Sequence, residues 1–540
     1  MTGFHYRHTR IFLEKHFNTA GPNNPDWHYT LDPLKRWDMD AVLTLIRQNK
    51  YFVLHAPRQT GKTSCLLALS DYLNNTNNYV ALYANIESAQ AAREDKFAGI
   101  RAVMGNISSN VKSHLNSNLL YDKWNHILQN FGPEQALTEL LKYWAQHEPK
   151  PIVLLLDEVD ALIGDTLISL LRQIRAGYAS RPAHFPASVI LCGVRDVRDY
   201  RIHSANSGEI ITGGSAFNIK AESLRLGDFT HEDIRNLYAQ HTQTTGQTFD
   251  DECWELVYEY TGGQPWLVNA LAYEACFRMK EGKDRSMPIT TSILEQAKEN
   301  LILRRDTHLD QLVDKLQEER VKRVIQPILQ TEGDIENLKT DDILYCIDLG
   351  LVKRTDEKTL AIKNAIYQEI IPRELTFDTQ AFIHQPQSWY VLPNGRLDMH
   401  KLLAAFQQFF REHSESWLQR FQYHEAGPQL LMQAFLQRIV NGGGRIDREY
   451  GLGRGRTDLY VQWHHASGTQ REVIELKVLR YSLEKTIETG MQQTAAYMDK
   501  CGADTGHLLI FDRRPGISWE EKIFHHSKSF QGRTMEVWGC

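Results

Sequence analysis

The sequence predicts a multidomain α/β protein. Its 540 residues exceed what one hydrophobic core accommodates, since single cores stop growing near about 250–300 residues. Continuous apolar runs at 151–156 and 188–194 are typical of strands buried on both faces of a parallel sheet. A further apolar run at 51–54 leads through a glycine-containing loop into a helix-like stretch at 64–69. This order of strand, loop and helix predicts an α/β fold for the first half of the chain.

The composition excludes several classes of protein. Hydrophobic residues make up 42% and charged residues 24%, which is ordinary for a globular protein, and the net charge of −6 argues against a uniformly basic surface for binding nucleic acid. A local basic groove stays compatible with that charge. The seven cysteines lack C-x-x-C spacing, so we expect neither a zinc knuckle nor a disulfide framework. Without a signal core or an apolar run long enough to span a bilayer, we expect a cytoplasmic protein.

The loop at 56–63 predicts a phosphate-binding site. In the pattern G-x-x-x-x-G-K-[ST], backbone N–H groups cradle phosphates, the lysine reaches the β and γ phosphates, and the hydroxyl residue binds Mg²⁺. Lys62 and Thr63 fill the last two positions, whereas Ala56, a small residue, replaces the first glycine. The alternative is a chance turn. The predicted nucleotide-binding residues are Ala56, Pro57, Arg58, Gln59, Thr60, Gly61, Lys62 and Thr63.

A second nucleotide signal follows the apolar run at 151–156. The run ends in Asp157 and Glu158, and we expect Asp157 to hold Mg²⁺ while Glu158 polarises the attacking water. A strand that ends in two acids is common by itself. Combined with Lys62 and Thr63, the pair predicts hydrolysis of a nucleotide.

Four motifs together resemble AAA-type ATPases of the STAND and archaeal-ATPase branch, over about residues 35–375. They are P-R-Q-T-G-K-T at 57–63, D-E-x-D at 157–160, G-V-R-D at 193–196 and G-G-Q-P at 262–265. The sequence also predicts a capped helix start at 228–233 and a helix break at 260–267. The resemblance implies bound ATP and Mg²⁺, a nucleotide-dependent homo-oligomer, and a lid that places Pro265 near the adenine or the phosphates.

The same resemblance implies arginines at the phosphates. Arg195 follows the strand at 188–194, where such ATPases place a sensor of the γ-phosphate. Arg172, Arg175 and Arg181 are candidates for an arginine finger that reaches a neighbouring subunit. For each of these arginines the alternative is an ordinary surface charge.

Residues 301–378 are similar to a winged helix. A helical stretch, a tight turn at Gly350 and a strand are followed by a second strand at 360–364. In such ATPases this module either packs as a conformational relay or binds DNA. Acidic residues balance the basic ones here, so the sequence favours a packing role.

The composition changes near residue 380, where prolines become frequent, which indicates a domain boundary. A helix is predicted after it, at 428–440. Two strands, at 453–461 and 473–478, then bring Asp458 and Glu475 side by side. Strand alternation places Glu475 and Lys477 on one face and turns the residue between them into the core. Two carboxylates can hold Mg²⁺ or Mn²⁺, while Lys477 positions a water molecule or stabilises the transition state.

This constellation resembles the PD-(D/E)xK nuclease superfamily, whose signature positions correspond to Asp458, Glu475 and Lys477. Thr457 stands where the usual proline precedes the aspartate. Gln493 and Tyr497 form a Q-x-x-x-Y motif, as in the RecB-like branch, and one helical turn places them on one face to brace the site or touch nucleic acid. The resemblance implies a restriction-endonuclease-like α/β/α domain.

The sequence thus predicts a P-loop AAA-type parallel sheet with a helical lid and a winged helix, followed by the nuclease-like domain. The expected parts are an N-terminal linker (1–35), an ATPase core (36–215), a helical lid (216–300), a winged helix (301–378), a helical connector (379–424) and the nuclease-like domain (425–540).

Two functions follow as hypotheses. In the first, the nucleotide state controls a metal-dependent DNA nuclease, a combination typical of prokaryotic antiphage and mobile-element conflict, with a regulatory protein or a foreign trigger as a further partner and no membrane. In the second, a regulatory ATPase carries a nuclease-like domain that only binds nucleic acid or a partner. A DNA-translocating motor is disfavoured because the sequence shows no second motor domain.

Overall fold

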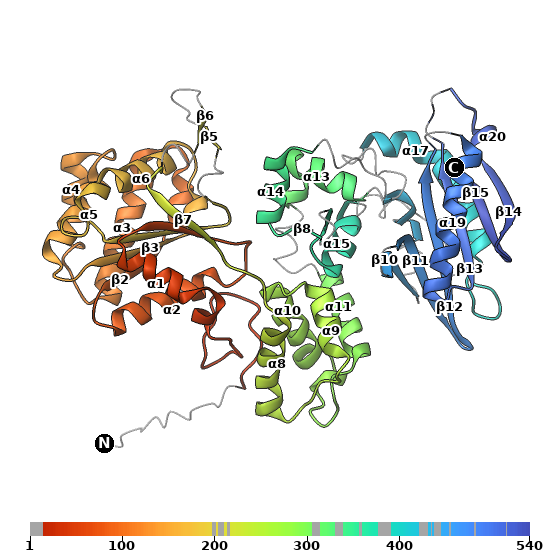
Figure 1. Ribbon diagram of the computed structural model, residues 1–540, viewed down its shortest axis with the longest axis horizontal. Coiled ribbons are helices and arrows are strands. Elements are labelled where there is room, and N and C mark those ends of the chain that lie inside the picture. The colour runs from red at the N-terminus through yellow and green to blue at the C-terminus, as the bar shows by residue number, and fades with distance from the viewer. Residues whose placement is uncertain are drawn as a thin grey trace, which may run out of the picture. The chain divides into compact units, whose positions relative to one another are not determined.

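The computed structural model of the chain divides into two compact units (Figure 1). The first comprises Met1–Arg304 together with Ile347–Leu351, and the second comprises Arg305–Cys346 together with Val352–Cys540. The short segment Ile347–Leu351 therefore belongs to the first unit although it lies late in the chain. The structure describes residues 14–196, 201–203, 210–212, 217–304, 314–329, 338–355, 359–375, 390–420, 430–433, 435–436, 444–452, 455–479, 482–512, 514 and 516–540.

The first unit contains a five-stranded parallel sheet in the order β2-β3-β4-β1-β7. The three central strands are buried along nearly their whole length, as their apolar sequences predict. Because these strands are parallel neighbours, their carboxyl ends meet at one edge of the sheet. The strands are β1 (Tyr51–His55), β2 (Val80–Asn85), β3 (Ile152–Asp157), β4 (Ser188–Gly193) and β7 (Lys220–Arg225).

Helices cover both faces of this sheet (Figure 1). Strand alternation divides the core, since Phe52 and Leu54 of β1 pack with one set of helices and Tyr51 and Val53 with the other. The first set is α1 (Met39–Arg47) and α2 (Lys62–Asn75), and the second is α3 (Lys96–His114), α4 (Trp124–Phe131), α5 (Ala136–His147) and α6 (Gly164–Ala176). Shorter elements are η1 (Pro33–Arg36), η2 (Glu87–Ala92), η3 (Val159–Ala161), η4 (Tyr178–Ser180) and the pair β5 (Arg201–His203) and β6 (Ile210–Thr212).

The helical lid follows β7. The predicted helix start is confirmed as a capping box between Thr230 and Asp233, and the predicted break is confirmed at Gly262, which ends α9 in a left-handed conformation. The predicted lid boundary at residue 216 is too early, because β7 is an edge strand of the core sheet. The lid helices are α8 (His231–Thr245), α9 (Cys253–Thr261), α10 (Pro265–Tyr273) and α11 (Thr291–Arg304), with η6 (Glu274–Arg278) and η7 (Glu281–Lys283) between the last two.

The segment that resembles a winged helix has the expected helix before Gly350 and the expected pair of strands, with further helices on either side. Gly350 has a φ of 76°, a conformation that favours glycine, and makes the tight turn into the first strand of an antiparallel pair. The elements are α13 (Glu319–Leu329), α14 (Thr340–Asp348), β8 (Val352–Arg354), β9 (Leu360–Ile362) and α15 (Ala365–Leu375).

The C-terminal domain contains a six-stranded mixed sheet in the order β10-β11-β12-β13-β15-β14. β10, β11 and β12 form an antiparallel meander, whereas β12, β13 and β15 are parallel to one another and β14 is antiparallel to β15. The strands are β10 (Gly444–Leu452), β11 (Gly455–His465), β12 (Gly468–Val478), β13 (Thr505–Phe511), β14 (Phe524–Phe530) and β15 (Arg533–Gly539).

Two long helices pack on opposite faces of this sheet, α17 (Met399–Arg420) and α19 (Leu483–Cys501), and a short helix α20 (Trp519–Lys522) precedes β14. Phe406 of α17 shares a core with Leu476 of β12, so the predicted connector at 379–424 is in part a layer of the domain itself. Of the helix predicted at 428–440, residues 430–433 and 435–436 are described and helical. Among the described residues, no helix has the length and apolar character needed to cross a membrane.

Candidate functional site

The phosphate-binding loop connects β1 to α2 at the carboxyl edge of the parallel sheet. Gln59 and Gly61 adopt positive φ values of 57° and 90°, which turn the loop back into the N-terminus of α2. Lys62 is 6% exposed, and its Nζ donates hydrogen bonds to the backbone oxygens of Ala56 and Pro57, both at 3.0 Å. The lysine amine therefore lies over the loop, where phosphate oxygens can replace the two carbonyl oxygens as its hydrogen-bond acceptors.

The structure explains why alanine, and not glycine, occupies the first position of the loop at Ala56. Its backbone N–H donates to the oxygen of Gly193 at 3.3 Å, which extends the pairing of β1 with β4 by one residue. Its methyl group is fully buried in the core beneath α1 and α2. The first position of the loop is thus a core position, and a methyl group adds buried apolar contact there.

The second motif meets the first at Asp157. Thr63 Oγ1 donates to Asp157 Oδ2 at 2.7 Å, and Asp157 is fully buried. A hydroxyl and a carboxylate at this separation are the hard oxygen donors that Mg²⁺ binds in nucleotide sites, so the residues present fit this ion. The structure therefore brings together the two predicted Mg²⁺ ligands of the ATPase half.

Sequence reasoning missed Tyr83. Its hydroxyl donates to Asp157 Oδ2 at 3.1 Å, and burial, followed by the charge of Asp157, raises the pKa of this phenol far above its ordinary value. Tyr83 lies on β2, which pairs with β3, and the sequence contains no signal for that pairing. Tyr83 orients the carboxylate that the Mg²⁺ chemistry requires.

Glu158 directly follows Asp157, the last residue of β3. It has a left-handed backbone with φ of 59°, and its N–H donates to Asp157 Oδ1 at 3.0 Å. Burial raises the pKa of the Glu158 carboxyl above its ordinary value, the charge of Asp160 adds to the effect, and Lys62 opposes it. A carboxylate with a raised pKa accepts a proton more readily, which suits a general base.

Arg195 follows β4 at the same edge of the sheet. Its Nε lies 3.6 Å from Asp348 Oδ2, and both side chains are largely buried. Around it, Arg225 Nη2 donates to the oxygen of Ile347 at 3.1 Å, and a Cβ added to Gly350 would lie 2.9 Å from Pro57 Cγ. The segment Ile347–Leu351 thus contacts both the predicted sensor arginine and the phosphate-binding loop.

The finger candidates differ in their surroundings. Arg172 and Arg175 are exposed on α6. Arg181 donates to the oxygen of Asn49 at 2.7 Å, and its guanidinium lies 3.3 Å from the ring centroid of Tyr178. These local contacts hold Arg181 in place. The role of an arginine finger stays a prediction for all three residues.

The lid motif begins α10. Gln264 caps the helix by accepting from the N–H of Leu267 at 2.6 Å, and Pro265 occupies the first helical turn, where its missing N–H costs nothing. Its placement near the adenine or the phosphates stays a prediction.

The second predicted site lies on β12. Glu475 and Lys477 are both buried on the sheet face that α19 covers, and their side chains form an ion pair at 3.0 Å. Asp458 lies in β11, and the pairing of Leu459 with Ile474 makes Asp458 and Glu475 the next positions along the ladder. The side chain of Asp458 lies outside the described residues.

The helix predicted after the lysine strand is α19. It contains Gln493, which is partly buried, and Tyr497, which is 8% exposed and packs in the core between α19 and the sheet. Among the residues whose side chains are described, no group of three His, Cys, Asp or Glu could hold a metal. The predicted nuclease metal site, which needs Asp458, stays a prediction.

Comparison with known proteins identifies the first half. Residues 34–371 match the family described as the AAA-like domain. The chain belongs to this AAA-like family. No curated protein matches it.

Solved structures resemble the AAA-like region at low identity. They include the Walker-type ATPase PABY2304 of Pyrococcus abyssi, with 12% identity, a TM-score of 0.44, and coverage of 66% of this chain and 99% of the other. Cdc6p of Pyrobaculum aerophilum has 15% identity, a TM-score of 0.35 and coverage of 63% and 93%. The RuvB Holliday junction branch migration motor of Thermotoga maritima has 13% identity, a TM-score of 0.31 and coverage of 62% and 95%.

The AAA-like family and the parallel sheet together make this half a P-loop ATPase domain, which implies ATP and Mg²⁺ at its site. In this AAA-like domain, Lys62 would contact the phosphates, and Thr63 and Asp157 would hold the ion. The part of the chain that is predicted to be nuclease-like lies beyond the matched residues.

A Tyr83→Phe substitution tests the role assigned to that hydroxyl. We expect the Mg²⁺ concentration needed for half-maximal ATP hydrolysis to rise about tenfold, the size typical of losing a hydrogen bond to a metal ligand. Titration of Mg²⁺ at saturating ATP measures this change. Tyr72→Phe, at an exposed tyrosine of α2, is the matched control. An unchanged Mg²⁺ requirement in Tyr83→Phe would show that the hydroxyl does not orient Asp157.

The lowered pKa of His55, the last residue of β1, predicts that the stability of the protein depends on pH. Burial lowers its pKa to about 4, and Arg225 and Lys220 add to the effect while Asp196 opposes it. Between about pH 6.5 and pH 4 the unfolded chain therefore binds a proton that the folded chain does not, so stability falls as the pH falls through this window, by up to about 3 kcal/mol.

His55→Gln removes this titration. Its thermal midpoint should decline less than that of the unchanged protein between pH 7 and pH 5, as measured by calorimetry in matched buffers. All other groups titrate alike in the two proteins, so parallel declines would contradict the lowered pKa.

Proposed function

We propose that this chain is an ATP-controlled nuclease, in which the AAA-like half binds and hydrolyses ATP and its nucleotide state controls metal-dependent cleavage of DNA by the C-terminal domain. The observation that carries the control is the ion pair between Arg195 and Asp348. It links the predicted γ-phosphate sensor to a segment that leads into the later part of the chain.

On the ATP side, four residues divide the work. Lys62 neutralises the phosphates, and Thr63 and Asp157 present oxygen ligands on the buried side of the loop. Mg²⁺, when bound, supplies positive charge that stabilises the phosphoryl transition state. Glu158 accepts a proton from the attacking water, which its raised pKa favours.

Control arises because a γ-phosphate competes with Asp348 for Arg195. The phosphate attracts the guanidinium, whereas Asp348 Oδ2 holds it at 3.6 Å. When Arg195 turns to the phosphate, its ion pair with Asp348 breaks. The segment Ile347–Leu351 then loses one of its contacts with the nucleotide site. The nucleotide state thereby changes the position or the mobility of the chain that follows.

On the nuclease side, Glu475 and Lys477 support the proposal. Burying two charges in a sheet is expensive, and apolar residues of similar volume stabilise such positions at least as well. Their presence side by side therefore favours a chemical role. With Asp458 as second carboxylate, Glu475 would hold Mg²⁺ or Mn²⁺, and Lys477 would orient the attacking water.

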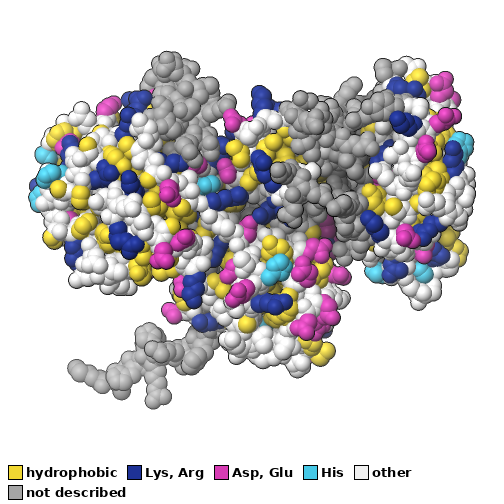
Figure 2. All heavy atoms as spheres, viewed as in Figure 1, with side chains coloured by type: hydrophobic (Ala, Val, Ile, Leu, Met, Phe, Trp, Pro, Cys, Tyr) yellow, Lys and Arg dark blue, Asp and Glu magenta, His cyan; other side chains and the backbone are white. Residues whose placement is uncertain are grey.

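DNA is the proposed substrate by family resemblance. Figure 2 shows basic and acidic side chains interspersed over the described surface of the C-terminal domain on the face drawn. Contact with DNA would thus depend on a local groove at the site. We place the switch in prokaryotic antiphage or mobile-element conflict, with homo-oligomers as the active form, because ATPase–nuclease combinations of this kind are typical there.

The second candidate is a regulatory ATPase whose nuclease-like domain only binds nucleic acid or a protein. The mutual ion pair of Glu475 and Lys477 is compatible with it, because a buried pair of opposite charges neutralises itself without a metal.

Asp348→Asn tests control at the ATP site. Releasing Arg195 from this contact should raise the ATP hydrolysis rate about fivefold, which corresponds to a barrier lower by about 1 kcal/mol. Asp342→Asn is the matched control, since Asp342 is equally buried and pairs with Arg320 and Arg323 in the second unit. Equal rates in the two variants would remove the basis for control through Asp348.

Glu475→Gln and Lys477→Ala test the nuclease. Each should lower cleavage of plasmid, linear duplex or single-stranded DNA with Mg²⁺ or Mn²⁺ by about 100-fold or more, because each removes a group that acts on the reacting atoms. Glu472→Gln changes another buried carboxylate of β12, one bonded to Gln470 and His507, and should retain cleavage. Full activity in both site variants contradicts the proposal, and DNA binding without cleavage by the unchanged protein favours the second candidate.

A further inference from the structure

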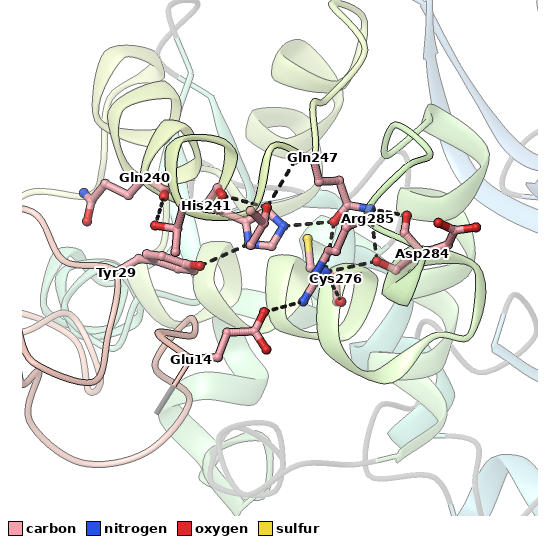
Figure 3. Close-up of polar contacts among 11 residues, drawn as sticks. Glu14, Tyr29, Gln240, His241, Gln247, Cys276, Asp284 and Arg285 are labelled. Atoms are coloured by element: carbon pink, nitrogen blue, oxygen red, sulfur yellow. Dashed lines mark hydrogen bonds and ion pairs between the residues drawn. The ribbon is translucent and has the colours of Figure 1, made fainter. Parts of the chain in front are cut away.

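Residues 14–36, which we call the strap, precede α1 and were expected as part of a linker. They instead pack against the lid, and Phe17 and Tyr29 are at most 1% exposed. Phe17 lies edge-to-face with Tyr238 of α8, and Tyr29 lies edge-to-face with His241 of the same helix. Figure 3 shows the polar contacts between the strap and the lid. Tyr29 Oη lies 3.3 Å from His241 Nδ1, and Glu14 forms an ion pair with Arg285 at 3.1 Å. The strap is thus anchored to the lid.

The same strap also reaches the ATP site. Trp266, at the start of α10, donates from Nε1 to the oxygen of Thr19 at 2.8 Å, and the N–H of Asn23 donates to Ser64 Oγ in the first turn of α2 at 3.2 Å. One short segment therefore bonds both to the lid helix that begins at the end of the G-G-Q-P motif and to the helix that begins at the phosphate-binding loop.

Arg36, the last residue of the strap, makes the tightest of these links. Its Nη1 donates to the oxygen of Thr60 in the loop at 2.9 Å, and its Nη2 donates to the oxygen of Gly227 at 2.5 Å. Its guanidinium also lies 4.6 Å from the ring centroid of Phe229. Hydrogen bonds from a charged donor are about twice as strong as neutral ones, so Arg36 holds the loop and residues 227–229 together.

From Phe229 the path continues into the lid. Its N–H donates to the oxygen of Gly263 at 2.7 Å, and a Cβ added to Gly263 would lie 2.1 Å from the oxygen of Phe229. Gly263 is followed by Gln264, the cap of α10. Phe229 therefore contacts both the lid motif and Arg36.

We propose that Arg36 is a positioning residue that makes the shape of the phosphate-binding loop depend on the position of the lid. The inference rests on the proposed binding of ATP. In a trans peptide the C=O and N–H point in opposite directions, so by holding the oxygen of Thr60, Arg36 directs the N–H of Gly61 the other way. The position of the lid therefore affects the direction of the Gly61 N–H. A nucleotide that accepts a hydrogen bond from this N–H affects the position of the lid in return.

The experiment compares the full-length protein with Arg36→Gln and Arg36→Lys by hydrogen–deuterium exchange, at saturating ADP and without nucleotide, after ADP affinity is measured by calorimetry. In the unchanged protein, ADP should protect both the loop at 57–66 and the lid turn at 262–273. In Arg36→Gln, ADP should bind about 10- to 100-fold more weakly, and at saturation should protect the loop while leaving the lid turn unchanged. Arg36→Lys, which retains the charge but cannot bridge both oxygens, should also lose the lid response.

Arg235→Gln is the matched control, since Arg235 is an exposed arginine of α8 whose guanidinium lies 6.0 Å from the ring centroid of Trp254. It should keep both responses. Lid protection that survives in both Arg36 variants, or that is absent from the unchanged protein with ADP bound, overturns the inference. Failure of the unchanged protein to bind any adenine nucleotide is a separate result that overturns the proposed ATP function.

Discussion

The hydrogen bond from Thr63 to Asp157 is the contact on which the ATP site depends. The two residues are 94 positions apart in the chain and meet at 2.7 Å because β1 and β3 both flank β4 in one parallel sheet. Tyr83 and Glu158 both donate hydrogen bonds to this carboxylate. The order of the strands, rather than any single motif, therefore assembles the catalytic geometry.

Two segments from outside the sheet bear on this centre. The strap reaches the phosphate-binding loop through Arg36 and Thr60, and Ile347–Leu351 reaches Arg195, which follows β4, through Asp348. One segment comes before the core in the chain and the other comes after the lid. The state of the nucleotide can therefore influence the lid and the later part of the chain through separate contacts, which is the arrangement that a switch requires.

The C-terminal site illustrates how far local pattern reasoning extends. Alternation along β12 predicts that Glu475 and Lys477 share a face, and they do, at 3.0 Å. It does not predict that α19 buries this face, nor that the expected connector supplies α17 to the other face. The burial of this pair is informative, because two charges inside a sheet reduce stability, and a functional role would explain why they are present.

The sequence by itself determined the local elements: the loop at 56–63, the buried strand that ends at Asp157, the buried strand that precedes Arg195, and the lid turn before Pro265. These follow from apolar periodicity and from glycine and proline, which act over a few neighbouring residues. Only the tertiary structure decided that β7 joins the core sheet, that Tyr83 contacts Asp157, and that Arg36 bonds to Gly227 across 191 positions. Periodicity reports that a side chain is buried but not which distant segment buries it, and that choice depends on packing the whole unit.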